Sequence, residues 1–155
     1  MIEQFQRDGY LAIPDLLTPA EVEAARAALT ELIRGNLKGE RLHIQYEPGV
    51  AARDELSVRK LMWFCDASPF LDDLANRHPK ITRIVETILG ANPILFQEMA
   101  LIKPPFIGSE KPWHQDNAYF AVTPLDAVLG VWIALDDATV ANGCMHVLRG
   151  EHKLG

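Results

Sequence analysis

Apolar side chains recur at helical spacing in the first part of the chain, starting shortly after residue 18. Thr18 can cap a helix, Pro19 suits the first helical position, and Glu21 completes a capping box. The positions that then repeat every three or four residues are Val22, Ala25, Leu29, Leu32 and Ile33. Gly35 ends the pattern, so the spacing predicts an amphipathic helix that packs on a sheet.

A second helical region begins at Ser68-Pro69 and stops at Gly90. It is interrupted near His78-Pro79, because proline disrupts the hydrogen bonding of a continuing helix. The helix that restarts there has its apolar face at Ile81, Ile84, Val85, Ile88 and Leu89. We therefore expect two consecutive helices in this region.

After Gly90 the periodicity changes from helical to alternating, which is typical of strands. The longest alternating run covers residues 94–103 and ends at Pro104-Pro105. Shorter runs predict strands at residues 42–46, 56–64, 128–135 and 144–148. Helices followed by strands indicate an α+β fold, with one domain over residues 1–155, a mainly helical flank at 15–90 and the main strands at 91–155.

Composition and charge narrow the functional class. The chain has 155 residues and a net charge of −6, which argues against a nucleic-acid or anionic-membrane partner because both need basic patches. No apolar run approaches the length of a membrane span. Cys65 and Cys144 lie far apart in the sequence and suggest reduced thiols, so we expect a cytoplasmic protein.

The most informative chemistry lies in residues 113–117, which read Trp-His-Gln-Asp-Asn. On an extended strand His114 and Asp116 would point to the same face and could hold one metal ion. They would supply two members of the two-histidine, one-carboxylate triad that binds Fe(II). The alternative is a turn histidine beside a solvated aspartate, and the three residues alone leave both interpretations open.

Further segments occur in a recognisable order along the chain. They are Phe5 with Asp8-Gly9-Tyr10, Lys103-Pro104-Pro105, the Trp113 to Asp116 motif, and residues 132–139, 142–145 and 150–153. Together they resemble the phytanoyl-CoA dioxygenase family of Fe(II)- and 2-oxoglutarate-dependent oxygenases. The resemblance implies a double-stranded β-helix, or jelly-roll barrel, with N-terminal flanking helices and with barrel strands over residues 91–155.

The resemblance also implies site residues. It assigns iron binding to His114 and Asp116, and 2-oxoglutarate binding to Lys60, Met99, Gln115 and Trp132. From the residues alone, Met99 and Trp132 fit plain barrel core, and Lys60 fits a solvated surface lysine. Related halogenases have a small residue at the aspartate position, so Asp116 favours hydroxylation of a small organic substrate.

The sequence departs from the family pattern near its end. The family's second iron-binding histidine and its 2-oxoglutarate-binding arginine follow a Gly-Ser-His segment, which here reads Gly150-Glu151-His152. No such pair follows before Gly155, so we expect the barrel to be truncated before it closes. The rival interpretation is a degenerate, non-catalytic binding or structural module, because two metal ligands without a third bind weakly.

Overall fold

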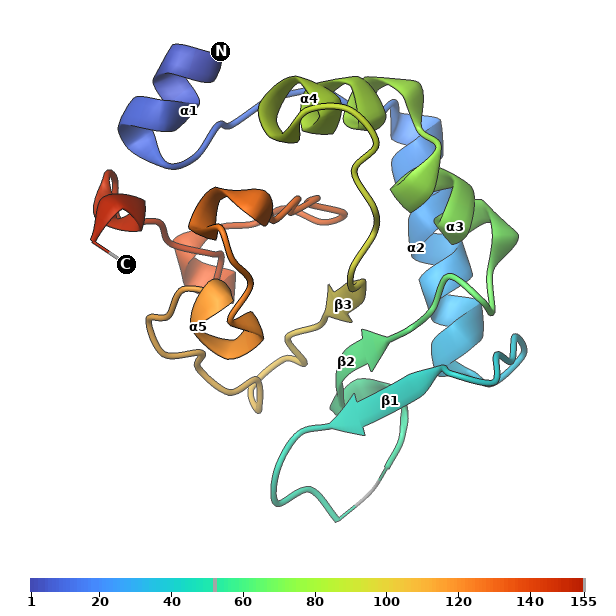
Figure 1. The fold of residues 1–155 in the computed structure, drawn as a ribbon. Helices are drawn as coiled ribbons and strands as arrows, with labels where there is room; N and C mark the ends of the chain where they lie inside the picture. Colours follow the sequence, from blue (N-terminus) through green and yellow to red (C-terminus); the bar gives the residue numbers. More distant parts are fainter. Residues whose placement is uncertain (52, 155) are drawn as a thin grey trace.

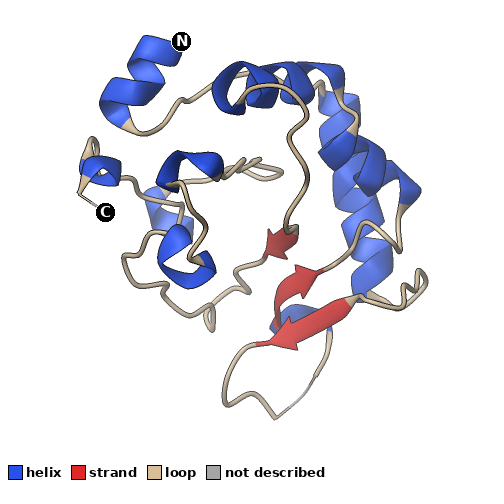
Figure 2. Cartoon of the chain, viewed as in Figure 1, coloured by secondary structure: helices blue, strands red, loops and turns tan. Residues whose placement is uncertain are grey.

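The chain folds into helices packed against a small sheet, as the computed structural model of residues 1–51 and 53–154 shows (Figure 1). Its helices are α1 (Ile2–Asp8), α2 (Pro19–Ile33), α3 (Pro69–Asn76), α4 (Pro79–Leu89) and α5 (Asn117–Phe120). Its strands are β1 (His43–Tyr46), β2 (Val58–Met62) and β3 (Met99–Leu101). Figure 2 shows that loops make up most of the chain beyond β3.

The ends of the helices follow from local chemistry, and the sequence predictions for them are confirmed. Thr18 and Glu21 form the capping box at the start of α2, where each side chain accepts from the other residue's backbone N–H. The side chain of Ser68 caps α3 and that of His78 caps α4. Gly90 follows α4 with a φ of 95°, a value that L side chains rarely adopt.

The three strands form one antiparallel sheet in the order β1-β2-β3. Lys60 pairs with Leu101, and Met62 pairs with Met99. Cross-strand partners share a face, as do residues two apart on a strand, so these four side chains lie on one face. Leu61 and its partner Ala100 lie on the other face.

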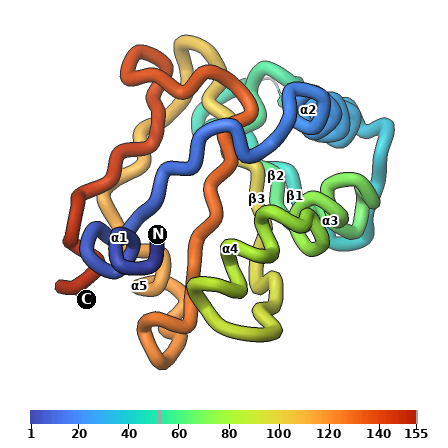
Figure 3. The backbone as a smooth tube through the Cα atoms, turned by 90° about the horizontal axis from the view of Figure 1, so that it is seen from above, coloured from blue at the N-terminus to red at the C-terminus, as the bar shows by residue number. Residues whose placement is uncertain are grey.

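The hydrophobic core forms between α2, α3 and the face of the sheet that carries Leu61. Its buried members are Ala25, Leu32, Val58, Leu61, Ala67 and Leu71. The sheet lies between these helices and the later part of the chain, in both the view of Figure 1 and that of Figure 3. The face that carries Lys60 and Met99 is therefore directed away from the helical layer.

Two strand predictions are wrong, and a third is correct only in part. The predicted strand 94–103 contains a strand only at Met99–Leu101, and the predicted strands 128–135 and 144–148 do not join the sheet. An extended segment becomes a strand only when its N–H and C=O groups pair with a neighbour, and the described residues supply no neighbouring strand for residues 128–135 and 144–148. Apolar side chains in them stay exposed, including Trp132 at 50% and Leu148 at 53%.

The observed class is mixed helix and sheet, in agreement with the predicted class at that level. Two of the three paired strands, β1 and β2, come from the region that the sequence indicated as mainly helical, and they pair with β3 from the later region. Among the helices of the described chain, none combines the length and the apolar character needed to cross a membrane.

Leu61 tests the position of the core. Its side chain is fully buried against α2 and α3, so we expect Leu61→Ala to lower the free energy of unfolding by about 2–5 kcal/mol. Leu101→Ala is the matched control on the opposite face, where Leu101 is 54% exposed, and it should cost about 1 kcal/mol or less. Urea unfolding measures both values; equal losses would contradict the assigned faces.

Glu21 makes stability depend on pH. Hydrogen bonds from the Thr18 backbone and hydroxyl, and then the contact with His78, lower the pKa of Glu21 to about 2. A carboxyl whose pKa is lower in the folded state stabilises the fold above its unfolded pKa, and the stabilisation disappears as pH falls through the folded pKa. We expect the stability advantage of the natural chain over Glu21→Gln to shrink as pH falls from about 4.5 to about 2. Urea titrations at several pH values measure it, with Glu23→Gln as the control that should show no such trend.

Candidate metal centre

The ring of His114 is oriented by its own local backbone. Its Nδ1 lies 2.7 Å from the carbonyl oxygen of Pro112, which can only accept a hydrogen bond, so Nδ1 carries the proton. In the neutral ring this leaves the lone pair on Nε2, the atom available to a metal. Tyr119 packs edge-on against the ring, with the centroids 5.7 Å apart.

Asp116 approaches the other ring nitrogen, Nε2, through a turn. The residue has helical angles, φ −57° and ψ −38°, and it immediately precedes α5. The extended geometry considered for His114 and Asp116 is therefore absent, because the start of α5 bends the backbone there. The two side chains nevertheless converge, with His114 Nε2 and Asp116 Oδ1 3.3 Å apart.

This spacing fits two ligands of one metal ion. Bonds of about 2.1 Å from a tetrahedral divalent ion such as zinc place two donor atoms about 3.4 Å apart. Both side chains also remain accessible, with 38% of the His114 and 65% of the Asp116 side chain exposed. Within residues 1–51 and 53–154, no set of three or more His, Cys, Asp or Glu side chains is arranged to hold a metal.

His146 lies near residues 113–116, but its ring contacts Trp113 and Cys144. Its ring packs edge-on against Trp113, with centroids 6.3 Å apart, and its Nε2 lies 3.9 Å from the Cys144 sulfur. Trp113 and Cys144 thus account for its orientation.

Both cysteines are free thiols, and burial is the main cause that raises the pKa of Cys65 to about 12.

Gln115 lies between His114 and Asp116 in the sequence, but its side chain contacts a later part of the chain. Its side-chain amide donates to the backbone carbonyl of Glu151 at 3.3 Å. This contact joins residues 113–116, which we call the metal motif, to the 3-10 turn Glu151–Lys153 near the end of the described chain. Its assigned contact with 2-oxoglutarate stays a prediction.

Lys60 and Met99 are brought together by the register of the sheet, on the face directed away from the core helices. Neither side chain is part of the buried core, and Met99 is 36% exposed. Trp132 lies in the unpaired segment that follows the 3-10 turn Leu125–Ala127. Within the described part of the chain, no hydrogen bond, ion pair or ring contact joins these three side chains to His114, so their place in a shared cavity stays a prediction.

Gly130, two residues before Trp132 in the sequence, is a neighbour of the candidate site. A methyl group built on its Cα would lie 4.0 Å from Oδ2 of Asp116. The absence of a side chain therefore keeps space open beside the carboxylate.

Sequence reasoning also missed a group of cations near Lys60. Burial and the charge of Arg59 lower the pKa of Lys111, and the charges of Lys60 and Lys103 act in the same direction. Glu47 opposes them and accepts a hydrogen bond from the Ser109 backbone at 3.2 Å. These residues are far apart in the sequence, so only the fold could have revealed the group.

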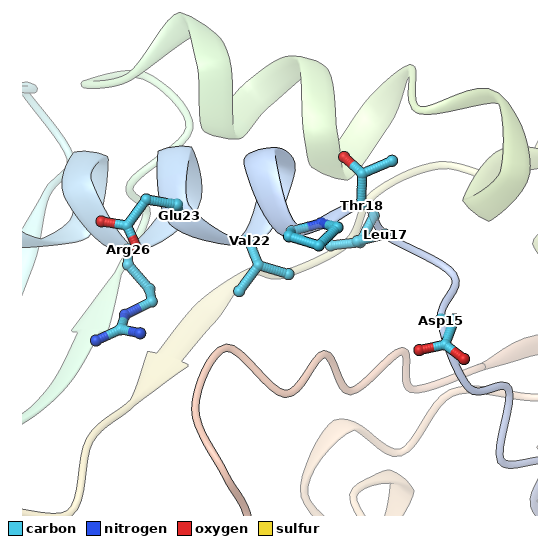
Figure 4. Close-up of a pocket in the computed structure, with 7 residues that line it drawn as sticks. Asp15, Leu17, Thr18, Val22, Glu23 and Arg26 are labelled. Carbon is cyan, nitrogen blue, oxygen red and sulfur yellow. The ribbon is translucent and has the colours of Figure 1, made fainter.

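A separate groove lies at the start of α2 (Figure 4). It is lined by Asp15, Leu17, Thr18, Pro19, Val22, Glu23 and Arg26, none of which is a candidate site residue. The groove is therefore separate from the place where His114 and Asp116 converge.

Comparisons with known proteins match nearly the whole chain. A family model described as Phytanoyl-CoA dioxygenase (PhyH) matches residues 5–155. Phytanoyl-CoA dioxygenase domain-containing protein 1 of Danio rerio is 29% identical, over 99% of this chain and 65% of that protein. The peroxisomal phytanoyl-CoA dioxygenase of Mus musculus is 28% identical, over 96% of this chain and 46% of that protein. The chain thus spans less than two thirds of the length of these relatives.

Gly130 supplies a test of the metal centre. We expect Gly130→Leu to weaken Mn(II) binding by about tenfold or more, because the larger side chain fills the space beside Asp116. Gly130→Ala is the matched control and should change the Kd by less than about twofold, since its methyl group makes an ordinary contact. The electron paramagnetic resonance signal of free Mn(II) gives both constants; equal affinities for the Leu and Ala variants would contradict the assignment.

Proposed function

The chain belongs to the phytanoyl-CoA dioxygenase family, and we propose that it carries the metal-binding part of an Fe(II)- and 2-oxoglutarate-dependent dioxygenase. The proposed reaction is hydroxylation of an unactivated C–H bond in a small organic substrate by dioxygen. One oxygen atom enters the alcohol product, and the other enters succinate as 2-oxoglutarate loses carbon dioxide. The family match and the names of its relatives support the oxygenase class.

One observation carries the proposal. His114 presents Nε2 to Asp116 Oδ1 at 3.3 Å, while the Pro112 carbonyl holds the opposite ring nitrogen. A histidine whose second nitrogen is held by a carbonyl is typical of metal ligands, because that contact sets the tautomer and the ring orientation. A surface histidine beside a solvated aspartate does not require this contact.

In the proposed site the chain's own residues bind iron and orient the co-substrate. His114 and Asp116 contribute one nitrogen and one carboxylate to iron, and Lys60 offers a positive charge to the dianionic co-substrate. Met99 and Trp132 would line the same space. When bound, iron and 2-oxoglutarate supply the oxidising chemistry, and the protein supplies binding and orientation.

The family membership also supports a proposal for the architecture. We infer a jelly-roll barrel in which β1, β2 and β3 belong to one sheet, with Lys60 and Met99 on its inner face. That face is directed away from α2 and α3, where the core lies. The two free thiols support a reducing, cytoplasmic location.

A second candidate function is a non-catalytic binding module. It is favoured by the described residues, which offer two convergent ligands and no third His, Cys, Asp or Glu. The two functions differ in one property. An oxygenase site binds metal and 2-oxoglutarate cooperatively, whereas a simple metal-binding module has no such coupling.

Linked binding tests the proposal. We expect 2-oxoglutarate to lower the Kd for Mn(II) by about tenfold, because the bound metal gains two oxygen ligands. His114→Ala should abolish binding, and Lys60→Gln should remove most of the 2-oxoglutarate effect while leaving binding of Mn(II) alone unchanged. Lys38→Gln, at an exposed site, is the charge-matched control.

Three outcomes decide between the functions. Metal binding that survives His114→Ala contradicts the site. Metal binding that depends on His114 but ignores 2-oxoglutarate favours the non-catalytic module. Equal effects of Lys60→Gln and Lys38→Gln remove Lys60 from the co-substrate site.

A further inference from the structure

The C-terminal end of α1 holds the last described turn of the chain through several polar contacts. Asp8 Oδ1 accepts from Arg149 Nε at 2.7 Å, and the Asp8 carbonyl accepts from the Gly150 N–H at 2.9 Å. His152 Nε2 lies 3.2 Å from the carbonyl oxygen of Gln6. Figures 1 and 3 both show α1 beside this end of the chain.

Asp8 is the centre of these contacts. It is only 5% exposed, and it accepts from Arg7 as well as from Arg149. The hydrogen bond from Arg7 is the main cause that lowers the pKa of Asp8 to about 2, so the carboxylate stays ionised near neutral pH. Hydrogen bonds between charged groups are roughly twice as strong as neutral ones.

Gly9 makes the close approach possible. Its φ is 81°, and a methyl group built on its Cα would lie 2.2 Å from Nδ1 of His152. Both the backbone angle and the space therefore require glycine. The turn that follows Arg149 is packed directly on the end of α1.

The same turn contacts the metal motif. The Glu151 carbonyl accepts from the Gln115 side-chain amide at 3.3 Å, and Gln115 lies between His114 and Asp116. A continuous set of contacts thus runs from Asp8 through Arg149 and Glu151 to Gln115. The neighbouring α5 is one turn long and has no buried residue. Its other contacts include two hydrogen bonds between Asn117 and Val122 and the edge-on packing of Phe120 against Phe96.

We propose that Asp8 is a positioning residue for the metal motif: it holds residues 149–151 against α1, and the Glu151 carbonyl then holds Gln115 and the adjoining start of α5. The functional meaning of this position rests on the proposed metal site. The structural link itself does not, so it is measurable in the metal-free chain.

Hydrogen–deuterium exchange of the metal-free chain tests the link. The amides of Ala118, Tyr119, Phe120 and Ala121 are bonded to carbonyls of residues 115–117 and report on the start of α5. We expect Asp8→Asn to speed their exchange by about tenfold, because the charge-assisted bond from Arg149 is weakened. Arg149→Met removes the same contact from the other side and should have the same effect.

Matched measurements separate positioning from a general loss of stability. Asp73→Asn breaks another Arg–Asp pair, on α3, and should leave α5 exchange unchanged. Amides of β1 and β2 should keep their protection in the Asp8 and Arg149 variants. Exchange that rises equally in β2 and α5, or in neither, overturns the inference.

Coupling to Gln115 completes the test. Gln115→Leu breaks the last contact of the set, so its effect on α5 exchange and that of Asp8→Asn should be less than additive. Full additivity overturns the proposed route.

In Mn(II) titrations Asp8→Asn should raise the Kd by about tenfold. Binding that depends on His114 but not on Asp8 contradicts this inference alone, whereas binding insensitive to His114 contradicts the proposed metal site and leaves the exchange results to decide the link.

Discussion

The approach of His114 Nε2 to Asp116 Oδ1 is the interaction on which this account of the molecule depends. It brings together an imidazole nitrogen and a carboxylate oxygen at 3.3 Å, a distance suited to a shared divalent ion. The Pro112 carbonyl and the start of α5 hold the two side chains from either side. The site is therefore built largely from short-range contacts, within residues 112–119.

The sheet adds the second constraint. Its two faces differ in character: Leu61 and Ala100 pack toward the core helices, whereas Lys60 and Met99 face away from them. A single register therefore separates the residues that stabilise the fold from residues that the family resemblance assigns to 2-oxoglutarate. A shift of one residue would exchange the two sets, so the pairing of β2 with β3 matters for stability and for the proposed chemistry alike.

Features that depend on short-range interactions were predictable from the sequence, whereas features that depend on distant residues were not. The helices were predictable because their ends depend on neighbours in the chain, as at Thr18 and Glu21. The long strand predictions failed because pairing depends on distant partners, and residues 128–135 have none within the described chain. The pair His114 and Asp116 was predictable, but the turn that joins them, the open space at Gly130 and the contacts of Asp8 with Arg149 arise only in the fold.

Nuclear magnetic resonance of the ¹⁵N-histidine-labelled chain, titrated with diamagnetic Zn(II), tests the central claim most directly. Five histidines contribute signals, and His114→Ala identifies the ring of interest. We expect Zn(II) to shift Nε2 of His114 while Nδ1 keeps its proton, and we expect Asp116→Ala to weaken the effect. Binding through Nδ1 of His114, or a Zn(II)-induced shift confined to other histidines, would contradict it.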